Sequence, residues 1–180
     1  ETFTESGIRL KSGEDLQADL IITATGLKVK MLNNIQVIVD DEIIHIGDTI
    51  AYKGVMSSNV PNFVSTFGYV NASWTLKSEL VAAYVCRLLN HMDRHDYAVC
   101  IPVLDTANAE RQPPVDFNPG YILRALDNLP KQSTRRPWKV YQNYIMDWLY
   151  LRASRLEDGV LQFTPRQQTT VQARREANPS

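Results

Sequence analysis

The sequence is poor in the residues from which metal and disulfide sites are built. Its two cysteines are too few for a disulfide framework or a cysteine-based zinc site, and its three histidines are scattered. We therefore expect no bound metal, and we take Cys86 and Cys100 as structural. The histidines are His45, His91 and His95, and His45 is as easily a surface residue as a functional one.

Strong net charge and long apolar runs are missing as well. The formal net charge is −1 over 180 residues. The sequence therefore lacks the excess of positive charge that is typical of proteins that bind nucleic acid or an anionic membrane. No apolar run approaches the ~20 residues that span a bilayer, and no charged-then-apolar leader opens the chain, so we expect a cytoplasmic protein. The chain begins at Glu1, directly in strand-like sequence, and we expect it to be cut from a longer polypeptide.

Glycine-rich phosphate-binding loops are a third absence. None of the eight glycines forms a G-x-G-x-x-G cluster, the loop that grips a dinucleotide pyrophosphate. Yet QADLIITATG, residues 17–26, reads as a buried strand ending in small residues, where ligands of open α/β sheets bind. We expect a hairpin with strands at 8–10 and 16–25, in which residues 20–22 are covered on both faces. Read alone, Thr25-Gly26 favours an ordinary turn.

The middle of the chain predicts a strand–turn–helix unit. Residues 35–48 contain one or two strands broken at Asp40-Asp41, and residues 62–66 form a short strand that ends near Gly68. A helix follows over residues 73–92, because apolar residues recur every three or four positions. Its stripe consists of Leu76, Leu80, Val81, Tyr84, Val85, Leu88, Leu89 and Met92, and Lys77, Glu79 and Arg87 lie off it.

The second half predicts more helices. Asn118 is a good N-cap with Pro119 at the first helical position, and the buried face would consist of Tyr121, Ile122, Ala125, Leu126 and Leu129. A further helix over about residues 139–153 would bury Val140, Tyr144, Ile145, Trp148 and Leu149. Residues 158–163 add a short strand, and residues 166–180 form a polar, disordered tail.

Two loops stand out as candidate sites. GYVNASW, residues 68–74, places Asn71 or Ser73 where either caps the long helix, whose first N–H groups would face an electron-rich group. YKGVMSSNVPNF, residues 52–63, is a small-residue loop that would line a flat ligand, though surface loops often look the same. Lys53 could bind phosphate, but a solvated lysine is the simpler interpretation, as it is for Arg135-Arg136. Hydrolase and lyase chemistry have no candidate residues.

In combination these stretches resemble the C-terminal part of the flavin-containing monooxygenases, most closely the Baeyer–Villiger type. GIRLKSGEDLQADLIITATGL resembles the family's hairpin and ATG strand, and residues 52–93 resemble the segment that closes over the flavin. FNPGYILRALDNLPKQSTRRPWKVYQNYIMDWLYL resembles the helical C-terminal portion. The family's glycine motifs and active-site arginine lie upstream of these segments, so the resemblance assigns no catalytic residue.

The resemblance implies an α/β fold, as the C-terminal part of a flavoprotein with two dinucleotide-binding domains. Residues 1–30 would end the NADP-binding region, 31–95 would complete the FAD-binding region, and 96–165 would be helical. FAD and NADPH are the implied cofactors, and one oxygen atom from O2 would pass to a ketone, or to sulfur or nitrogen, of a small molecule. The implied cofactor-binding residues are Thr25, Gly26, Met56, Ser57, Asn71, Ala72, Ser73 and Trp74, with the Tyr52-Lys53-Gly54 turn beside them.

Two alternatives stay open. A flavin-dependent pyridine-nucleotide oxidoreductase also carries an ATG strand and a terminal strand–helix at the flavin. A non-enzymatic interaction module would instead use the aromatic residues of the last helix, Tyr141, Tyr144, Trp148 and Tyr150. Under the main interpretation we expect the isolated chain to be catalytically silent and to bind FAD poorly, because it lacks the loops that hold the adenosine and pyrophosphate.

Overall fold

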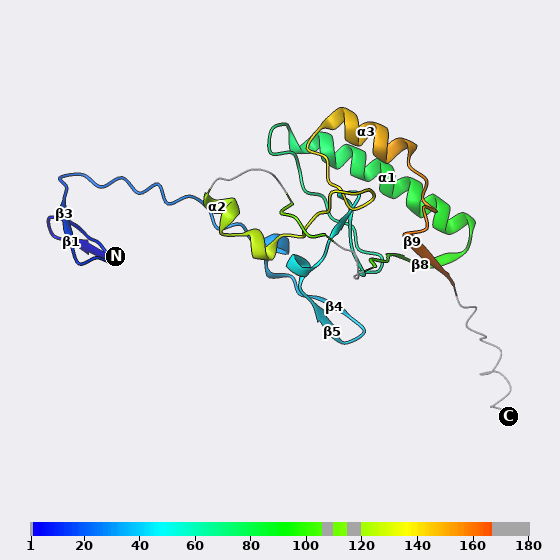
Figure 1. Cartoon of the computed structure of the whole chain (residues 1–180), viewed down its shortest axis with the longest axis horizontal. Helices are drawn as coiled ribbons and strands as arrows, with labels where there is room; N and C mark the ends of the chain where they lie inside the picture. The colour runs from blue at the N-terminus through cyan, green and yellow to red at the C-terminus, as the bar shows by residue number, and fades with distance from the viewer. Residues whose placement is uncertain (1, 106–109, 115–119, 167–180) are drawn as a thin grey trace, which may run out of the picture.

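The N-terminal segment forms a small sheet that stands apart from the rest of the molecule. The computed structural model describes residues 2–105, 110–114 and 120–166. β1 (Thr2–Thr4), β2 (Gly7–Arg9) and β3 (Asp15–Gln17) pair antiparallel in that order. Residues 18–30 then run without regular secondary structure toward the remainder (Figure 1). We call residues 2–30 the arm and the described residues from 46 to 166 the body.

The predicted hairpin is present, but its return strand ends at Gln17 rather than Thr25. Leu20 and Ile22, predicted to be covered on both faces, are 78% and 82% exposed. Among the described residues, none pairs as a strand with residues 19–25. A buried strand needs hydrogen-bonded neighbours and apolar layers on both faces, and this segment has neither, so the prediction of a buried ATG strand is wrong for this structure.

A tight hairpin and two 3₁₀ turns connect the arm to the body. β4 (Val37–Val39) and β5 (Glu42–Ile44) are joined by Asp40-Asp41, whose φ angles of 50° and 67° form the two-residue turn that suits a hairpin. The predicted break at Asp40-Asp41 is therefore confirmed. The flanking 3₁₀ turns are η1 (Met31–Asn34) and η2 (Ile46–Asp48).

The long helix lies where the apolar periodicity predicted it. α1 spans Trp74–Arg94, and its buried apolar residues are Leu80, Val81, Tyr84, Leu88 and Met92. Leu89 is exposed, because it lies beside the stripe rather than on it. Lys77, expected off the stripe, is only 1% exposed. It occupies the position one turn before Leu80 and Val81, so it belongs to the buried face.

A second helix packs on α1 in a different register from the predicted one. α3 spans Tyr144–Ala153 and lies along α1 (Figure 1). It begins at residue 144 because the Asn143 side chain accepts a hydrogen bond from the Met146 N–H at 3.0 Å, as an N-cap does. Its buried residues are Asp147 and Leu151. The predicted face was wrong for Ile145, Trp148 and Leu149, which are exposed because they lie one step around the helix.

Arg87 fastens the two helices together. Its guanidinium, on α1, donates hydrogen bonds to the carbonyl groups of Leu151, Arg152 and Ser154 at the end of α3. The last carbonyls of a helix have no partner within the helix, so Arg87 satisfies groups that would otherwise need water.

The remaining elements close the body. β6 (Ala51–Tyr52) pairs with β7 (Met56–Ser57), and β8 (Tyr97–Pro102) pairs with β9 (Leu161–Pro165), which confirms the short strand predicted near residue 160. The strand predicted at 62–66 is reduced to one bridge between Met56 and Val64. α2 (Gly120–Leu123) and η4 (Leu126–Asn128) bury Ile122, Ala125 and Leu129 as predicted.

The core lies between α1, α3 and these strand pairs. Its buried members are Tyr52, Val55, Met56, Leu80, Val81, Tyr84, Leu88, Met92, Cys100, Leu151 and Leu161. The coarse α/β class is confirmed, and the paired strands of the described residues are antiparallel. Asn118, Pro119 and the predicted tail after Arg166 lie outside the described residues. No helix in the described part of the chain is long and apolar enough to cross a membrane.

Candidate functional site

The loop that starts with Tyr52 is a tight hairpin turn rather than a flexible surface loop. Lys53, Gly54 and Val55 connect β6 to β7, and the Val55 N–H donates to the Tyr52 carbonyl at 2.9 Å. Lys53 and Gly54 have left-handed φ angles of 54° and 65°, as residues in tight hairpin turns often do. Glycine adopts this conformation freely, whereas lysine does so at a cost. A side chain at Gly54 would also approach the Lys77 ammonium to 3.4 Å. The strained Lys53 therefore needs strong contacts to hold it.

Those contacts come from the loop between α3 and β9. The Lys53 ammonium lies 3.0 Å from a carboxylate oxygen of Asp158 and donates a hydrogen bond to the Arg155 carbonyl at 3.0 Å. Three tyrosine rings surround it, and the nearest, Tyr52, is 4.8 Å from the ammonium at its centroid. Lys53 is buried, so neither of the roles expected for it, a solvated lysine or a phosphate ligand, is correct.

Burial and pairing act in opposite directions on this ion pair. Burial lowers the pKa of the Lys53 ammonium, and the neighbouring Asp158 offsets part of that effect. Burial alone would raise the pKa of Asp158. The Leu161 N–H, the Tyr52 hydroxyl and the Lys53 ammonium all donate to the carboxylate, and together they leave its pKa below the usual value. The charged pair is thus a structural anchor for the turn.

A second buried lysine holds the start of α1. The Lys77 ammonium lies 2.7 Å from an oxygen of Asp147 on α3, and both side chains are almost fully buried. The Tyr69 hydroxyl donates to the same carboxylate oxygen at 2.8 Å. Burial, followed by this hydrogen bond to the carboxylate, raises the pKa of Tyr69. Asp147 therefore joins the first turns of α1 to the GYVNASW segment, which contains Tyr69.

The GYVNASW segment packs closely on itself. A side chain at Gly68 would lie 2.2 Å from the Trp74 indole, so only glycine fits there. Phe67 lies against the other side of the turn, with its ring centroid 5.5 Å from that of Trp74. The Gln142 side chain accepts a hydrogen bond from the Val70 N–H at 3.1 Å. These contacts fix the path of the backbone into α1.

The first turn of α1 is left open to solvent. Ser73 occupies the N-cap position, but its hydroxyl lies 2.7 Å from the Thr75 hydroxyl and makes no capping bond. Asn71, Ala72, Ser73 and Trp74 are all exposed, Trp74 by 57%. The free N–H groups and the positive end of the helix dipole therefore face outward, where an electron-rich ligand group is stabilised.

Met56 and Ser57 lie inward from this turn. They are buried, and they line a mainly apolar cavity together with Gly54, Ser65, Phe67 and Val140. Phe67 also contacts Trp74, so this wall of the cavity reaches the start of α1. Of the predicted cofactor-binding residues, Met56 and Ser57 lie in the cavity wall, and Asn71, Ala72, Ser73 and Trp74 lie at the exposed helix start.

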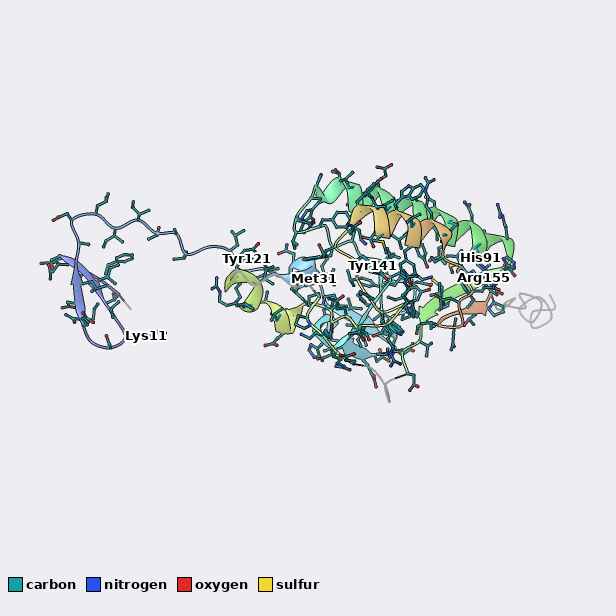
Figure 2. All side chains as sticks on the ribbon, turned by 45° about the horizontal axis from the view of Figure 1, so that its top comes forward. Lys11, Met31, His91, Tyr121, Tyr141 and Arg155 are labelled. Atoms are coloured by element: carbon teal, nitrogen blue, oxygen red, sulfur yellow. The ribbon has the colours of Figure 1, made fainter. Side chains whose placement is uncertain are left out.

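Thr25 and Gly26 lie in neither of these two places. Both are exposed in the irregular segment that leads from the arm. Gly26 has a φ of 75°, and a side chain there would lie 3.9 Å from Arg124, beside α2. Figure 2 shows the arm, with Lys11 labelled, reaching well away from the body. The structure therefore gives Thr25 and Gly26 no place in the pocket around Met56.

Other sequence candidates have structural or surface positions. Asn59 and Asn62, in the small-residue loop, hold the edge of β8: the Asn62 side chain accepts from the Cys100 N–H, and the Asn59 side chain accepts from the Leu104 N–H. Cys100 is buried, which raises the pKa of its thiol, whereas Cys86 is exposed and not a core residue. Arg136 donates to the Tyr141 hydroxyl at 2.8 Å.

Sequence reasoning missed the charged residues that pair in the body. It placed Lys77 off the apolar stripe and assigned no partner to Asp147 or Asp158, whose side chains are 1% and 22% exposed. A signal existed for the first pair: each charge occupies a buried position of its helix, Lys77 before Leu80 and Asp147 before Leu151. Opposite charges on the facing stripes of two helices indicate a buried ion pair.

The exposed helix start, and not the cavity beside Met56, suits part of a flat, electron-rich ring. The cavity has a volume of about 40 Å³, far below the ~300 Å³ of the smallest typical ligand pockets, so it holds no ring of that size. The uncapped start of α1 offers exposed N–H donors to the polar edge of a reduced flavin. The described residues include no glycine-rich loop that would hold a pyrophosphate.

Comparisons with known proteins give an independent line of evidence. The FAD-containing monooxygenase EthA of Mycobacterium tuberculosis is 46% identical over 166 residues, which cover 92% of this chain and 34% of the relative. EthA of Mycolicibacterium smegmatis is 44% identical over 90% of this chain and 33% of its own length. The "Probable FAD-binding monooxygenase AlmA" of Acinetobacter baylyi is 44% identical over 94% of this chain and 34% of its own length.

The chain spans about a third of the length of the curated relatives that it matches. No family model matches it, and no solved structure matches it. The likeness to the relatives nevertheless covers the arm, the hairpin turn and the helix start together, because the matched region takes in nearly the whole chain.

Proposed function

Because the chain is homologous to the C-terminal third of FAD-containing monooxygenases, we propose that the complete protein is an FAD-dependent monooxygenase of a small organic molecule. The observation that carries the proposal is the 46% identity to such an enzyme over 92% of the chain. The exposed start of α1 at residues 71–74 supports it, because its free N–H donors suit the polar edge of a flavin ring.

Bound FAD would supply the activation of O2, and this chain would supply orientation and charge stabilisation. The free N–H groups at the start of α1 would stabilise negative charge on the polar edge of the reduced ring. Trp74, fixed against Gly68, would keep that helix start in place. Met56 and Ser57 would line the ring or the substrate, and Thr25 and Gly26 would join them where the arm is held by the rest of the protein.

NADPH as the reductant and a ketone as the substrate are finer parts of the same proposal. A Baeyer–Villiger reaction would insert one oxygen atom beside the carbonyl, and a heteroatom substrate would receive it on sulfur or nitrogen. The isolated chain should lack this activity and should bind FAD poorly. A ligand held on one face leaves little binding energy to offset the ~4–15 kcal/mol entropic cost of association.

The complete protein tests the proposal directly. It should be yellow, release FAD on denaturation, and consume NADPH and O2 together when a ketone or sulfide is added. Mass spectrometry should find one oxygen atom from ¹⁸O2 in the product. A colourless protein without releasable flavin would overturn the proposal, and oxidation of NADPH without oxygen transfer would favour the pyridine-nucleotide oxidoreductase.

A variant pair tests the site. Asn71→Ala, at the start of α1, should weaken FAD binding by the complete protein severalfold and leave its melting temperature unchanged. Asn90→Ala is the matched control, since Asn90 is also exposed but lies near the far end of α1. Equal FAD affinities in the two variants would remove residues 71–74 from the site.

A further inference from the structure

Three potential metal ligands meet at the C-terminal end of α1. A ligand atom from each of His91, His95 and Glu157 lies within 4.8 Å of the other two. His91 lies in the last turn of α1, His95 is the C-cap residue that follows it, and Glu157 lies in the loop between α3 and β9. Figure 2 labels His91 at this end of the helix. The histidines are therefore not scattered, as the sequence suggested, because a spacing of four residues places them on one helix face.

The hydrogen bond of His95 prepares its ring for a metal. Its Nδ1 lies 2.9 Å from the His91 carbonyl oxygen. When Nδ1 donates to that carbonyl, Nε2 carries no proton and keeps its lone pair. Metal-bound histidines characteristically use one ring nitrogen as a ligand and donate from the other to a carbonyl or carboxylate.

His91 presents the second donor from a partly buried ring. Its Nε2 is 3.1 Å from a carboxylate oxygen of Glu157, yet among the described residues this buried nitrogen makes no well-aligned hydrogen bond. Phe163 lies against the ring, with centroids 5.1 Å apart, and holds its plane. Glu157 is exposed enough to rotate, so it can adjust to a shared ligand.

From this geometry we propose that His91, His95 and Glu157 bind a divalent transition-metal ion, with Zn²⁺ as the expected occupant. Two imidazoles and one carboxylate are ligands that Zn²⁺ accepts, whereas Mg²⁺ and Ca²⁺ prefer oxygen alone. Ligands ~2.0–2.2 Å from a tetrahedral zinc lie roughly 3.3 Å apart, close to the His91–Glu157 separation. The site would leave one position for water.

The charge of the helix end favours a cation here. The last carbonyls of α1 give its C-terminus a partial negative charge, which attracts cations within the last turn. The site lies about 27 Å along α1 from Ser73, at ~1.5 Å per residue, so its metal would take no part at the proposed flavin surface. A metal at this point would link α1 to the loop that carries Asp158, the partner of Lys53.

The test uses the 180-residue chain after treatment with a chelator. Zn²⁺ at a hundredfold excess over its dissociation constant should raise the melting temperature by roughly 5–10 °C, and calorimetry should give one site with micromolar affinity. Co²⁺ should give the visible absorption of a tetrahedral site. Mg²⁺ should have no effect.

The third histidine is a natural control. His45→Gln should keep the zinc response, because His45 is exposed in a different part of the chain. His91→Gln and His95→Gln should lose it, and Glu157→Gln should weaken zinc binding at least tenfold. Circular dichroism without metal should be the same for all four variants. Absence of a zinc-dependent shift in the unmodified chain, or a shift that survives in His95→Gln, would overturn the proposal and leave only a His91–Glu157 ion pair.

Discussion

The arm and the body both contain apolar stretches, but these side chains are exposed in the arm and buried in the body. In the arm, Leu20, Ile22 and Leu27 are exposed along a segment without strand partners. In the body, Leu80, Tyr84 and Leu151 are buried between two helices and two strand pairs. An apolar run predicts only that a residue gains from burial. Whether burial happens depends on a second surface, which α3 provides for α1 and which nothing among the described residues provides for the arm.

The same contrast holds for charged residues. Arg9 and Asp15 of the arm form an exposed ion pair with a 2.8 Å contact, and such pairs contribute ~0–1 kcal/mol to stability. Lys77 and Asp147 form a buried pair, where removal of one partner strands a charge in the core. Stability should therefore be concentrated in the body, and four measurements on the 180-residue chain test this difference between body and arm.

The largest effect should come from Asp147→Leu. The substitution leaves the Lys77 ammonium buried without its carboxylate and removes the acceptor of the Tyr69 hydroxyl. The free energy of unfolding measured in urea should therefore fall by about 3–5 kcal/mol. The double variant Lys77→Met/Asp147→Leu should recover much of this loss, because it removes both charges. A single variant as stable as the unmodified chain would show that the pair is not buried in solution.

Core truncation should come next. Leu80→Ala opens a cavity in the face that α1 turns toward the core, and we expect a loss of ~2–5 kcal/mol in the free energy of unfolding. The matched control is Leu89→Ala, the same substitution on the same helix at an exposed position. It should change stability by less than ~0.5 kcal/mol. Equal losses would mean that α1 is covered on both sides.

A smaller effect should appear on acidification. The folded pKa of Asp158 lies below its ordinary value of 3.8, so the folded state holds fewer protons than the unfolded state as the pH falls past that value. The contribution of Asp158 is complete at pH 5 and is lost as the pH drops through the folded pKa. Between pH 5 and pH 3 the melting temperature should therefore fall a few degrees further in the unmodified chain than in Asp158→Asn. Identical slopes would contradict the anchor role of Asp158.

The smallest effect should come from the arm. Ile22→Ala removes a side chain that is already exposed, so the urea midpoint should stay within the range of ~0.5 kcal/mol typical of surface changes. A clear loss of stability would show that the arm folds against the body or against a second copy of the chain. Sedimentation of the unmodified chain would separate these two explanations, because only the second depends on concentration.

Sequence alone could predict the elements whose evidence is local. The apolar residues of α1 recur within a few positions, and the Asp40-Asp41 turn carries its own chemistry. The helix and the turn were therefore predicted, although Leu89 and Lys77 were assigned to the wrong faces of α1. The Lys77–Asp147 pair was missed although each charge falls on the buried stripe of its helix, because its members lie seventy residues apart and neither segment alone shows that the two helices pack together. The α3 register failed for a related reason: a polar residue, Asp147, occupies its buried face.

The candidate site also contains some residues that the sequence could place and others that it could not. The GYVNASW turn and the buried Met56 and Ser57 belong to segments that pack in the body, and Phe67 links the cavity of Met56 to Trp74. Thr25 and Gly26 could not be placed, because their position depends on strands outside the arm. The cofactor contacts of all eight residues stay predictions.

Arg155 and Asp158 hold the Lys53-Gly54 turn, and their distance from Lys53 in the sequence affects when the body can fold during synthesis. Lys53 reaches its carboxylate partner only when residue 158 has been synthesised, and at ~5–20 residues/s the ribosome needs about 5–20 s to travel between them. β8 likewise waits for β9, some sixty residues later. The body must therefore fold late, after most of the chain has left the ribosome, and until then the lysine is solvated by water and its strained turn stays unformed.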